Sequence, residues 1–149
     1  GGNVAFGNRN ASQEKIEEYT RYAAIYDDIA SLPEGFNTMV GERGVTLSGG
    51  QKQRISIARA FIKDPDIVIL DDCLSAVDTN TEQQILGYIN GATVERTIIT
   101  ITHRIYGLLN FDKIIVLENG GISEAGTHEE LLGNKGFYFD MFEKQRLEE

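Results

Sequence analysis

The chain has 149 residues, with 14 Lys and Arg against 23 Asp and Glu and a formal net charge of −9. This length is enough for one domain with a hydrophobic core, and the acidic balance argues against a nucleic-acid partner, which would require a basic surface. The single cysteine, Cys73, excludes an internal disulfide, and no apolar stretch reaches the roughly 20 residues of a membrane-spanning helix.

The first 60 residues are predicted to be mainly helical and to form a lobe of their own. Capping residues, acidic first turns and prolines predict helices over residues 12–22, 24–32 and 48–63. Residues 1–10 are expected to be extended or loose, and residues 34–46 are expected to form a loop.

Two strands and a connecting helix are predicted in the middle of the chain. The continuous apolar run 67–70 is typical of a strand buried on both faces, and 97–101 is rich in β-branched residues. A helix is expected over 79–90, and a short one after His103. Strand, helix, strand predicts parallel pairing and an α/β fold.

The last part of the chain is predicted to be a hairpin followed by two helices. Residues 113–118 and 122–125 flank the turn sequence Asn-Gly-Gly at 119–121. Helices are expected over 127–132 and from Phe137 to the end. We interpret His128 as part of a helix start and not as a catalytic residue.

The most informative segment is Leu47-Ser48-Gly49-Gly50-Gln51. Ser48 and Gln51 match a helix capping box, so the segment has a purely structural interpretation. Two glycines in the first turn, however, cost about 1 kcal/mol each in helix stability. They are favoured where a phosphate or another backbone comes close to a helix N-terminus.

Three further polar side chains follow the two predicted strands. Asp71 and Asp72 end the first strand, and His103 follows the second. Ligands of open α/β sheets bind beyond the carboxyl ends of the strands, and carboxylates there suit Mg²⁺. The carboxylate pair alone also fits a solvated turn, and a lone histidine such as His103 is more often a structural residue.

Taken in order, these motifs resemble the ATP-binding domain of ABC transporters of the exporter type. Residues 47–51 look like the signature motif, 67–72 like the Walker B strand, 75–78 like the D-loop and His103 like the H-switch. The resemblance implies a partial P-loop NTPase (RecA-like) core with parallel strands and an α-helical signature subdomain. It implies a signature subdomain over 1–62 and the C-terminal part of the core over 63–149.

The resemblance also implies roles for individual residues, with ATP and Mg²⁺ as cofactors. Asp71 would bind the metal through water, and Asp72 and His103 would be catalytic. The residues implied to bind ATP are Ser48, Gly49, Gly50, Gln51 and Asp78. In this family the signature contacts the γ-phosphate of ATP held mainly by a second nucleotide-binding domain, which makes that domain a partner.

Asp72 departs from the family's hydrolysing pattern, which has glutamate at this position. Aspartate is one methylene shorter, and a misplacement of about 1 Å can lower a rate on the order of 100-fold. We therefore expect this chain's own site to hydrolyse ATP slowly or not at all. Cys73-Leu74 in place of the commoner Ala-Thr fits such a degenerate site, and both features favour a partner subunit of different sequence.

Residues 41–44 resemble the X-loop of ABC exporters, in which Glu42 and Arg43 would contact a transmembrane domain at the cytoplasmic face of a membrane. No G-x-x-x-x-G-K-[ST] loop is present, and the resemblance implies that the Walker A loop and a membrane domain precede residue 1. Without that loop the chain alone is expected to be an inactive ATPase. The alternatives are a non-transport ABC ATPase, a regulatory module that holds ATP without hydrolysing it, and an acidic interaction domain.

Overall fold

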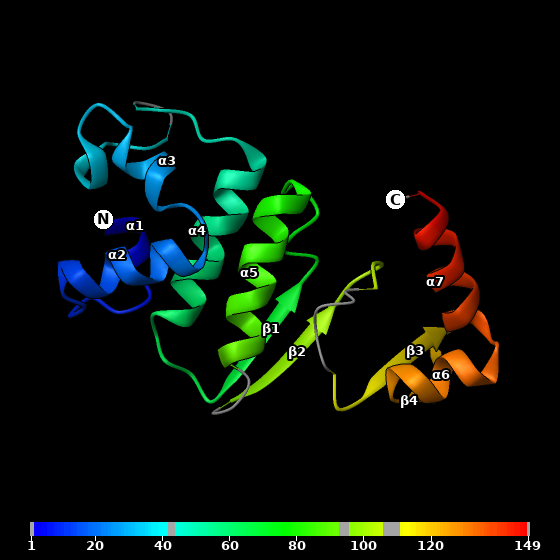
Figure 1. Ribbon diagram of the computed structural model, residues 1–149. Helices are drawn as coiled ribbons and strands as arrows, with labels where there is room; N and C mark the ends of the chain where they lie inside the picture. Colours follow the sequence, from blue (N-terminus) through cyan, green and yellow to red (C-terminus); the bar gives the residue numbers. More distant parts are fainter. Residues whose placement is uncertain (1, 42–43, 93–95, 106–110, 149) are drawn as a thin grey trace. The chain divides into compact units, whose positions relative to one another are not determined.

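The computed structural model describes residues 2–41, 44–92, 96–105 and 111–148 (Figure 1). The chain divides into two compact units, Gly1–Ile101 and Thr102–Glu149, and each is described by itself. Among the described residues, no helix is both long enough and apolar enough to cross a membrane. The predicted α/β class is confirmed.

The first unit consists of a short parallel sheet and a group of helices. The sheet pairs β1 (Ile67–Asp71) with β2 (Thr97–Ile101), in a register that places Ile69 opposite Ile99. The helices are α1 (Gly2–Ala5), α2 (Gln13–Tyr22), α3 (Tyr26–Ala30), α4 (Gly49–Phe61) and α5 (Thr79–Ala92).

The helix boundaries follow local chemistry. Ser12 caps α2, because its hydroxyl accepts a hydrogen bond from the Lys15 N–H at 3.2 Å. Ala24 has φ +51°, a left-handed conformation that interrupts the helical backbone between α2 and α3. The helix predicted over 24–32 therefore begins only at Tyr26 and ends at Ala30.

Two predictions for irregular backbone were wrong in part. Residues 2–5 form α1 instead of an extended segment, because Val4, which is 2% exposed, is buried in the helical core. Within the expected loop 34–46, residues Gly35–Asn37 form a 3₁₀ turn, η1. Short helical turns of this kind leave little periodicity in the sequence, since they span only one turn.

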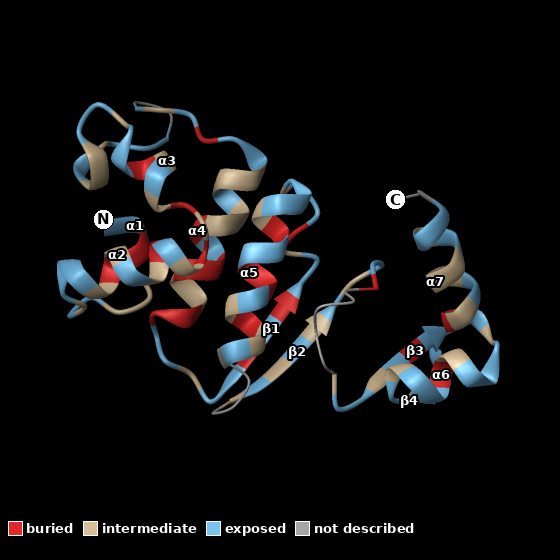
Figure 2. Ribbon diagram, viewed as in Figure 1, coloured by how far each residue is buried: buried red, intermediate tan, exposed pale blue. Residues whose placement is uncertain are grey.

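The prediction that the first strand is buried on both faces was wrong for this chain. Val68 and Leu70 are 3% and 4% exposed, whereas Ile67 and Ile69 are 59% and 62% exposed (Figure 2). On β2, Ile99 and Ile101 are also exposed, at 46% and 52%. The sheet therefore packs against helices with one face and presents a second, apolar face uncovered by any described residue of its unit.

The N-terminal helices do not form a lobe apart from the strands. Tyr22 of α2 stacks on Tyr88 of α5 with ring centroids 4.0 Å apart, and Tyr88 also contacts Phe61 edge-on. These aromatic contacts join α2, α4 and α5 into one unit with the sheet. The subdomain boundary expected at residue 62 thus lies inside a compact unit, and it stays a prediction about functional subdomains.

The second unit is a hairpin covered by two helices, as predicted. The hairpin pairs β3 (Ile114–Glu118) with β4 (Gly121–Gly126), and the helices are α6 (His128–Asn134) and α7 (Phe137–Glu148). Asn119 and Gly120 connect the strands, with φ +49° and +78°. Positive φ at both central residues matches the type I′ turn that Asn-Gly favours.

The core of the second unit is small. It contains Ile105, Val116, Leu131 and Tyr138. The His128 ring lies edge-on to Tyr138, and its Nδ1 is 2.8 Å from the Tyr138 hydroxyl, in keeping with a structural role at the start of α6. The helix predicted after His103 falls on residues 106–110, which lie outside the described residues.

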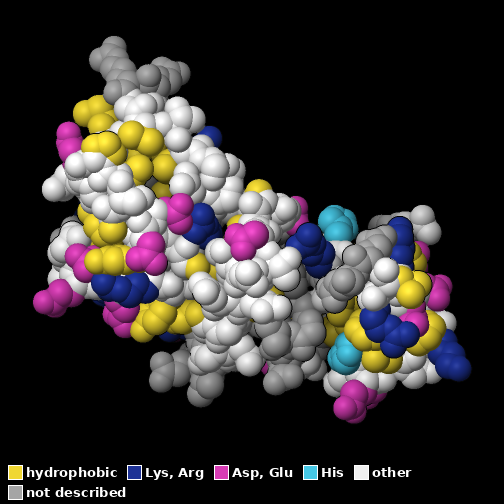
Figure 3. All heavy atoms as spheres, turned by 45° about the horizontal axis from the view of Figure 1, so that its top comes forward, with side chains coloured by type: hydrophobic (Ala, Val, Ile, Leu, Met, Phe, Trp, Pro, Cys, Tyr) yellow, Lys and Arg dark blue, Asp and Glu magenta, His cyan; other side chains and the backbone are white. Residues whose placement is uncertain are grey.

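Charged side chains are mixed over the surface drawn in Figure 3. On this face, Lys and Arg side chains lie among Asp and Glu side chains. Opposite charges are thus interspersed there, although acidic residues outnumber basic ones by 23 to 14 in the sequence.

Candidate functional site

The candidate site begins at the N-terminus of α4, where Ser48 is the cap. The Ser48 hydroxyl accepts a hydrogen bond from the Gln51 N–H at 3.2 Å, and the Gln51 side-chain oxygen accepts one from the Ser48 N–H at 2.9 Å. The predicted capping box is therefore confirmed. Its two hydrogen bonds satisfy the backbone N–H groups of Ser48 and Gln51. The other N–H groups of the first turn are left without a partner within the helix.

The N–H groups of Gly49 and Gly50 have no hydrogen-bond partner within the described part of the chain. Gly49 is exposed, so its N–H lies at the open, electropositive end of α4. A helix N-terminus with free N–H groups binds anions such as phosphate.

The two glycines differ in how closely the rest of the chain approaches them. A Cβ at position 50 would lie 2.5 Å from the Ala76 carbonyl oxygen, so this glycine lets the 72–78 loop pack against α4. A Cβ at position 49 would meet only the Ala76 side chain, at 3.7 Å. Packing within this chain therefore explains Gly50 but not Gly49, which faces outward.

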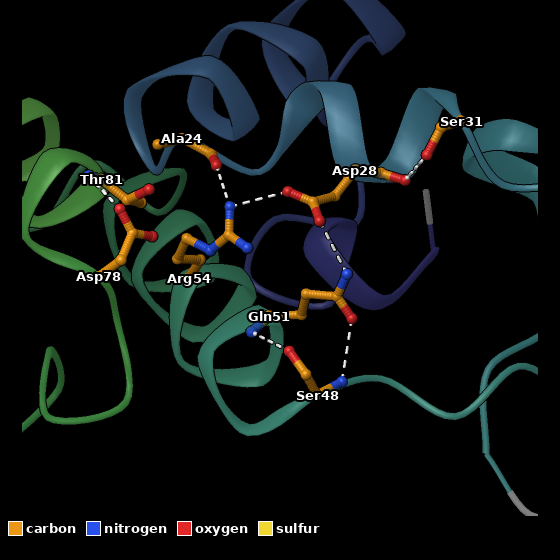
Figure 4. A network of polar contacts seen from close by, with 8 residues as sticks. All are labelled: Ala24, Asp28, Ser31, Ser48, Gln51, Arg54, Asp78 and Thr81. Carbon is orange, nitrogen blue, oxygen red and sulfur yellow. Dashed lines mark hydrogen bonds and ion pairs between the residues drawn. The ribbon is translucent and has the colours of Figure 1, made fainter.

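A polar network joins the start of α4 to α3 (Figure 4). Asp28 accepts hydrogen bonds from the Gln51 amide nitrogen and from Arg54, both at 2.8 Å. Arg54 also donates to the Ala24 carbonyl oxygen. Because Arg54 is largely buried, with 14% of its side chain exposed, this ion pair is shielded from water on one side.

A second set of contacts joins α4 to the loop after β1. The Gln53 side chain donates to the Ser75 hydroxyl at 2.9 Å and accepts from the Ala76 N–H at 3.0 Å. The Ser75 hydroxyl in turn donates to the Asp72 carbonyl oxygen at 3.0 Å. Gln53 thus holds the segment that carries Asp72 beside α4.

The paired carboxylates lie at the carboxyl end of β1. Asp71 is the last residue of the strand and Asp72 follows it, and both are exposed. Asp72 has φ +43°, and its N–H donates to the Ile101 carbonyl oxygen at 2.9 Å, which extends the pairing with β2 by one bond. The turn therefore begins at Asp72, where the chain leaves the sheet.

Asp78 caps α5. Its carboxylate accepts a hydrogen bond from the Thr81 N–H at 3.1 Å. Hydrogen bonds from the Thr81 side chain and backbone lower the pKa of Asp78. Asp78 is thus an ionised group at a helix N-terminus, beside the loop that Gln53 holds.

Cys73 lies between the paired carboxylates and the D-loop-like segment. Burial raises the pKa of Cys73 to about 11, and the neighbouring Asp72 and Asp71 add to this effect. The thiol is therefore protonated at neutral pH, which excludes a role as a thiolate nucleophile there.

His103 belongs to the second unit, in the segment that follows β2. Its side chain is exposed, and the next residue is held by a hydrogen bond from the Arg104 N–H to the Thr102 hydroxyl at 2.9 Å. The structure brings Ser48, Gly49, Gly50 and Gln51 together with the 72–78 loop, whereas His103 is placed only within its own unit.

Two other candidate residues, Glu42 and Arg43, lie outside the described residues. Their neighbours form a tight turn, in which the Gly44 N–H donates to the Gly41 carbonyl oxygen at 2.9 Å. Val40 and Val45 form an isolated bridge across its base.

The sequence reasoning missed Asp28 and the contacts of Gln53. The sequence predicts no role for the side chains of Gln53 and Arg54, which follow the 47–51 segment. The spacing of Gln51 and Arg54, three residues apart on one helix, shows that they share a face. No sequence signal identified Asp28, 23 residues earlier, as their partner.

The carboxylate oxygens of Asp71 and Asp72 are ligands that suit Mg²⁺, but the two side chains alone are too few to bind the ion. Among the described residues, no group of three His, Cys, Asp or Glu side chains could hold a metal. Mg²⁺ is usually bound by one or two carboxylates together with substrate phosphates and water, so two exposed carboxylates are compatible with a metal that arrives with a nucleotide.

Comparison with known proteins agrees with this geometry. The family model described as ABC transporter matches residues 4–75. The chain is 50% identical over 146 residues to the multidrug resistance-like ATP-binding protein MdlA of Escherichia coli, covering 98% of this chain and 25% of that protein. It is 46% identical over 145 residues to YheI of Bacillus subtilis, a probable multidrug resistance ABC transporter ATP-binding/permease protein, with 97% and 25% covered.

A solved structure shares the fold. A bacterial Atm1-family ABC exporter with ATP bound matches with a TM-score of 0.86 and 43% identity, over 96% of this chain and 25% of the other. The chain thus spans about a quarter of the length of these relatives. It belongs to the ABC transporter family and is a fragment of an exporter-type ATP-binding domain.

Proposed function

We propose that the protein to which this chain belongs couples ATP binding and hydrolysis to export across a membrane, with this domain on the cytoplasmic face. The observation that carries the proposal is the start of α4, where Gly49 and Gly50 present free N–H groups on an exposed helix end. The similarity to a solved ABC exporter supports it.

The signature segment 48–51 acts on ATP that a second nucleotide-binding domain holds. Gly49 supports this assignment, because the packing of the residues that the structure describes does not require a glycine there. Asp78 lies in the neighbouring loop and contributes to the same interface. A γ-phosphate would accept hydrogen bonds from the free N–H groups and from the Ser48 hydroxyl.

The carboxylates after β1 serve the nucleotide of this domain. Asp71 would hold Mg²⁺, which would supply charge stabilisation to the phosphates. Asp72 accepts a proton from the attacking water over a longer distance than a glutamate would, and His103 donates a hydrogen bond to the γ-phosphate. Glu42 and Arg43 contact the transmembrane domain.

The short carboxylate at position 72 makes this domain the slower of two unequal sites. In that arrangement the intact signature completes the competent site on a partner subunit of different sequence. A regulatory nucleotide-binding subunit is the second candidate function, and Asp72 is the feature that favours it.

Binding of MgATP to the isolated 149-residue chain tests whether this chain supplies only part of the contacts to the nucleotide. Because a helix N-terminus and two carboxylates supply only part of the phosphate contacts, we expect dissociation constants weaker than micromolar in isothermal titration calorimetry. Micromolar or tighter binding by this chain would contradict the proposal. Adenosine serves as the control, since it lacks the phosphates that these groups recognise.

Turnover of the whole transporter tests the signature. A Gly49→Asp substitution places a carboxylate where the γ-phosphate is expected, so ATP hydrolysis should fall at least about tenfold through charge repulsion. Undiminished hydrolysis would refute the assignment of the signature segment. The exposed Gly87 of α5 offers the control, since Gly87→Asp makes the same change on a helix away from the site.

A further inference from the structure

We propose that Asp28 of α3 is a positioning residue that sets the orientation of the signature segment 48–51 by acting through Gln51. The inference deepens the proposed function and rests on it, since it concerns the same helix end. Asp28 itself lies in α3, whereas the free N–H groups lie at the start of α4, and Figure 4 shows Asp28 beside Gln51 and Arg54.

Each oxygen of the Asp28 carboxylate has its own donor. Oδ1 accepts from the Gln51 amide nitrogen at 2.8 Å, and Oδ2 accepts from Arg54 Nη1 at 2.8 Å. Rotation of the carboxylate would break at least one of these bonds. Arg54 is further held by the Ala24 carbonyl oxygen, so three points fix α3 and the turn before it to α4.

Asp28 decides which way the Gln51 amide faces. A carboxylate can only accept, so the amide must turn its NH₂ group to Asp28 and its oxygen away. That oxygen then accepts from the Ser48 N–H at 2.9 Å. The reverse orientation would place two acceptors together at Asp28 and two donors together at Ser48.

The orientation of Gln51 in turn sets what the helix end offers to a ligand. With its N–H bound by Gln51, Ser48 keeps the cap conformation, φ −64° and ψ 165°, and its hydroxyl oxygen accepts from the Gln51 N–H. The hydroxyl proton is left to donate outward, beside the free N–H groups of Gly49 and Gly50. Three donors are thus aligned by one carboxylate in another helix.

The test uses the full-length transporter with its partner subunit, and Asp27 provides a matched control. Asp27 lies on the same helix turn and is exposed, whereas Asp28 is half-buried. We expect Asp28→Ala to raise the KM for MgATP about tenfold with kcat within about threefold of wild type, because it misaligns groups that contact ATP before and during the reaction. Asp27→Ala should leave both constants unchanged.

Asp28→Asn keeps the size of the side chain and allows a test if the alanine variant does not assemble. Its single oxygen can accept from only one of the two donors, so we expect a rise in KM of about threefold. A value equal to that of Asp27→Asn would overturn the proposal.

A double-mutant cycle with Gln51→Ala distinguishes positioning from a general loss of structure. If Asp28 acts through Gln51, the effect of Asp28→Ala on KM should largely disappear in the Gln51→Ala background. Additive effects on KM would overturn the proposal, as would kinetic constants of Asp28→Ala equal to wild type. Melting temperatures of all variants, measured in parallel, report the purely structural contribution.

The Gly49→Asp variant separates the two levels of inference. If Gly49→Asp leaves hydrolysis unchanged, the proposed function fails. If Gly49→Asp abolishes hydrolysis while the Asp28 variants behave like their Asp27 counterparts, only the positioning role of Asp28 fails.

Discussion

The aspartate at position 72 is one methylene group shorter than the glutamate that we expect in a fully hydrolysing site. We expect Asp72→Glu to raise ATP turnover at this domain's own site about tenfold or more, because the carboxylate would move closer to the attacking water. The measurement is steady-state hydrolysis by the full transporter, with the partner's own catalytic site disabled so that only this site is counted. An unchanged rate would show that the length of this side chain does not limit the reaction.

The reactivity of the Cys73 thiol reports on burial and negative charge beside the same carboxylates. Burial, assisted by Asp72 and Asp71, raises its pKa to about 11, so the reactive thiolate is scarce at neutral pH and increases with pH. We expect the rate of alkylation by iodoacetamide to rise about tenfold per pH unit from pH 8 to pH 10. A rate that levels off near pH 9, as for free cysteine, would contradict the stated environment.

Within α4, the two adjacent glycines predict opposite outcomes for the same substitution. Gly50→Ala should destabilise the fold by about 1–3 kcal/mol despite the better helix propensity of alanine, because the new methyl would overlap the Ala76 carbonyl oxygen. Gly49→Ala is the matched control and should stay within about 1 kcal/mol of wild type. Urea unfolding of both variants measures the difference, and equal free energies of unfolding would contradict it.

The elements with strong local chemistry were the ones that the sequence predicted best. Ser48 and Gln51 give a capping box, and Asn119-Gly120 gives a two-residue turn with positive φ, so α4 and the β3–β4 hairpin followed directly from residue types. Where the backbone conformation depends on packing, prediction failed. The left-handed conformation of Ala24 has no signal of its own, since alanine favours helix.

The residues of the candidate site can be proposed from the sequence, but the contacts between them cannot, and their roles stay predictions. The order of the motifs identified Ser48, Gly49 and Asp71, since each belongs to a short local pattern. The contacts of Asp28 with Gln51 and of Gln53 with Ser75 join segments more than 20 residues apart. Such pairs depend on how helices pack, which one sequence does not specify.

For the molecule as a whole, the uncovered face of the β1–β2 sheet is the main liability. The exposed side chains of Ile67, Ile69, Ile99 and Ile101 form an apolar surface over two paired strands. Surfaces of this kind drive association in water. We therefore expect the isolated 149-residue chain to self-associate at tens of micromolar, in sedimentation velocity at about 0.15 M salt.

Charge provides the control for this prediction. With a net charge of −9, copies of the chain repel one another, and salt screens this repulsion, so association should strengthen as salt is added. Ile69→Lys should reduce association, whereas Leu147→Lys, which changes an 82%-exposed residue of α7, should not. Equal effects of the two substitutions would show that another surface is responsible.

The amide of Gln51 has a further consequence for how the helix start responds to acidity. It donates to Asp28 and accepts from Ser48 without carrying a proton that can be lost. A carboxylic acid in its place could do both only when protonated, and would oppose Asp28 at neutral pH. Glutamine therefore gives the start of α4 a geometry that does not depend on ionisation of the side chain at position 51.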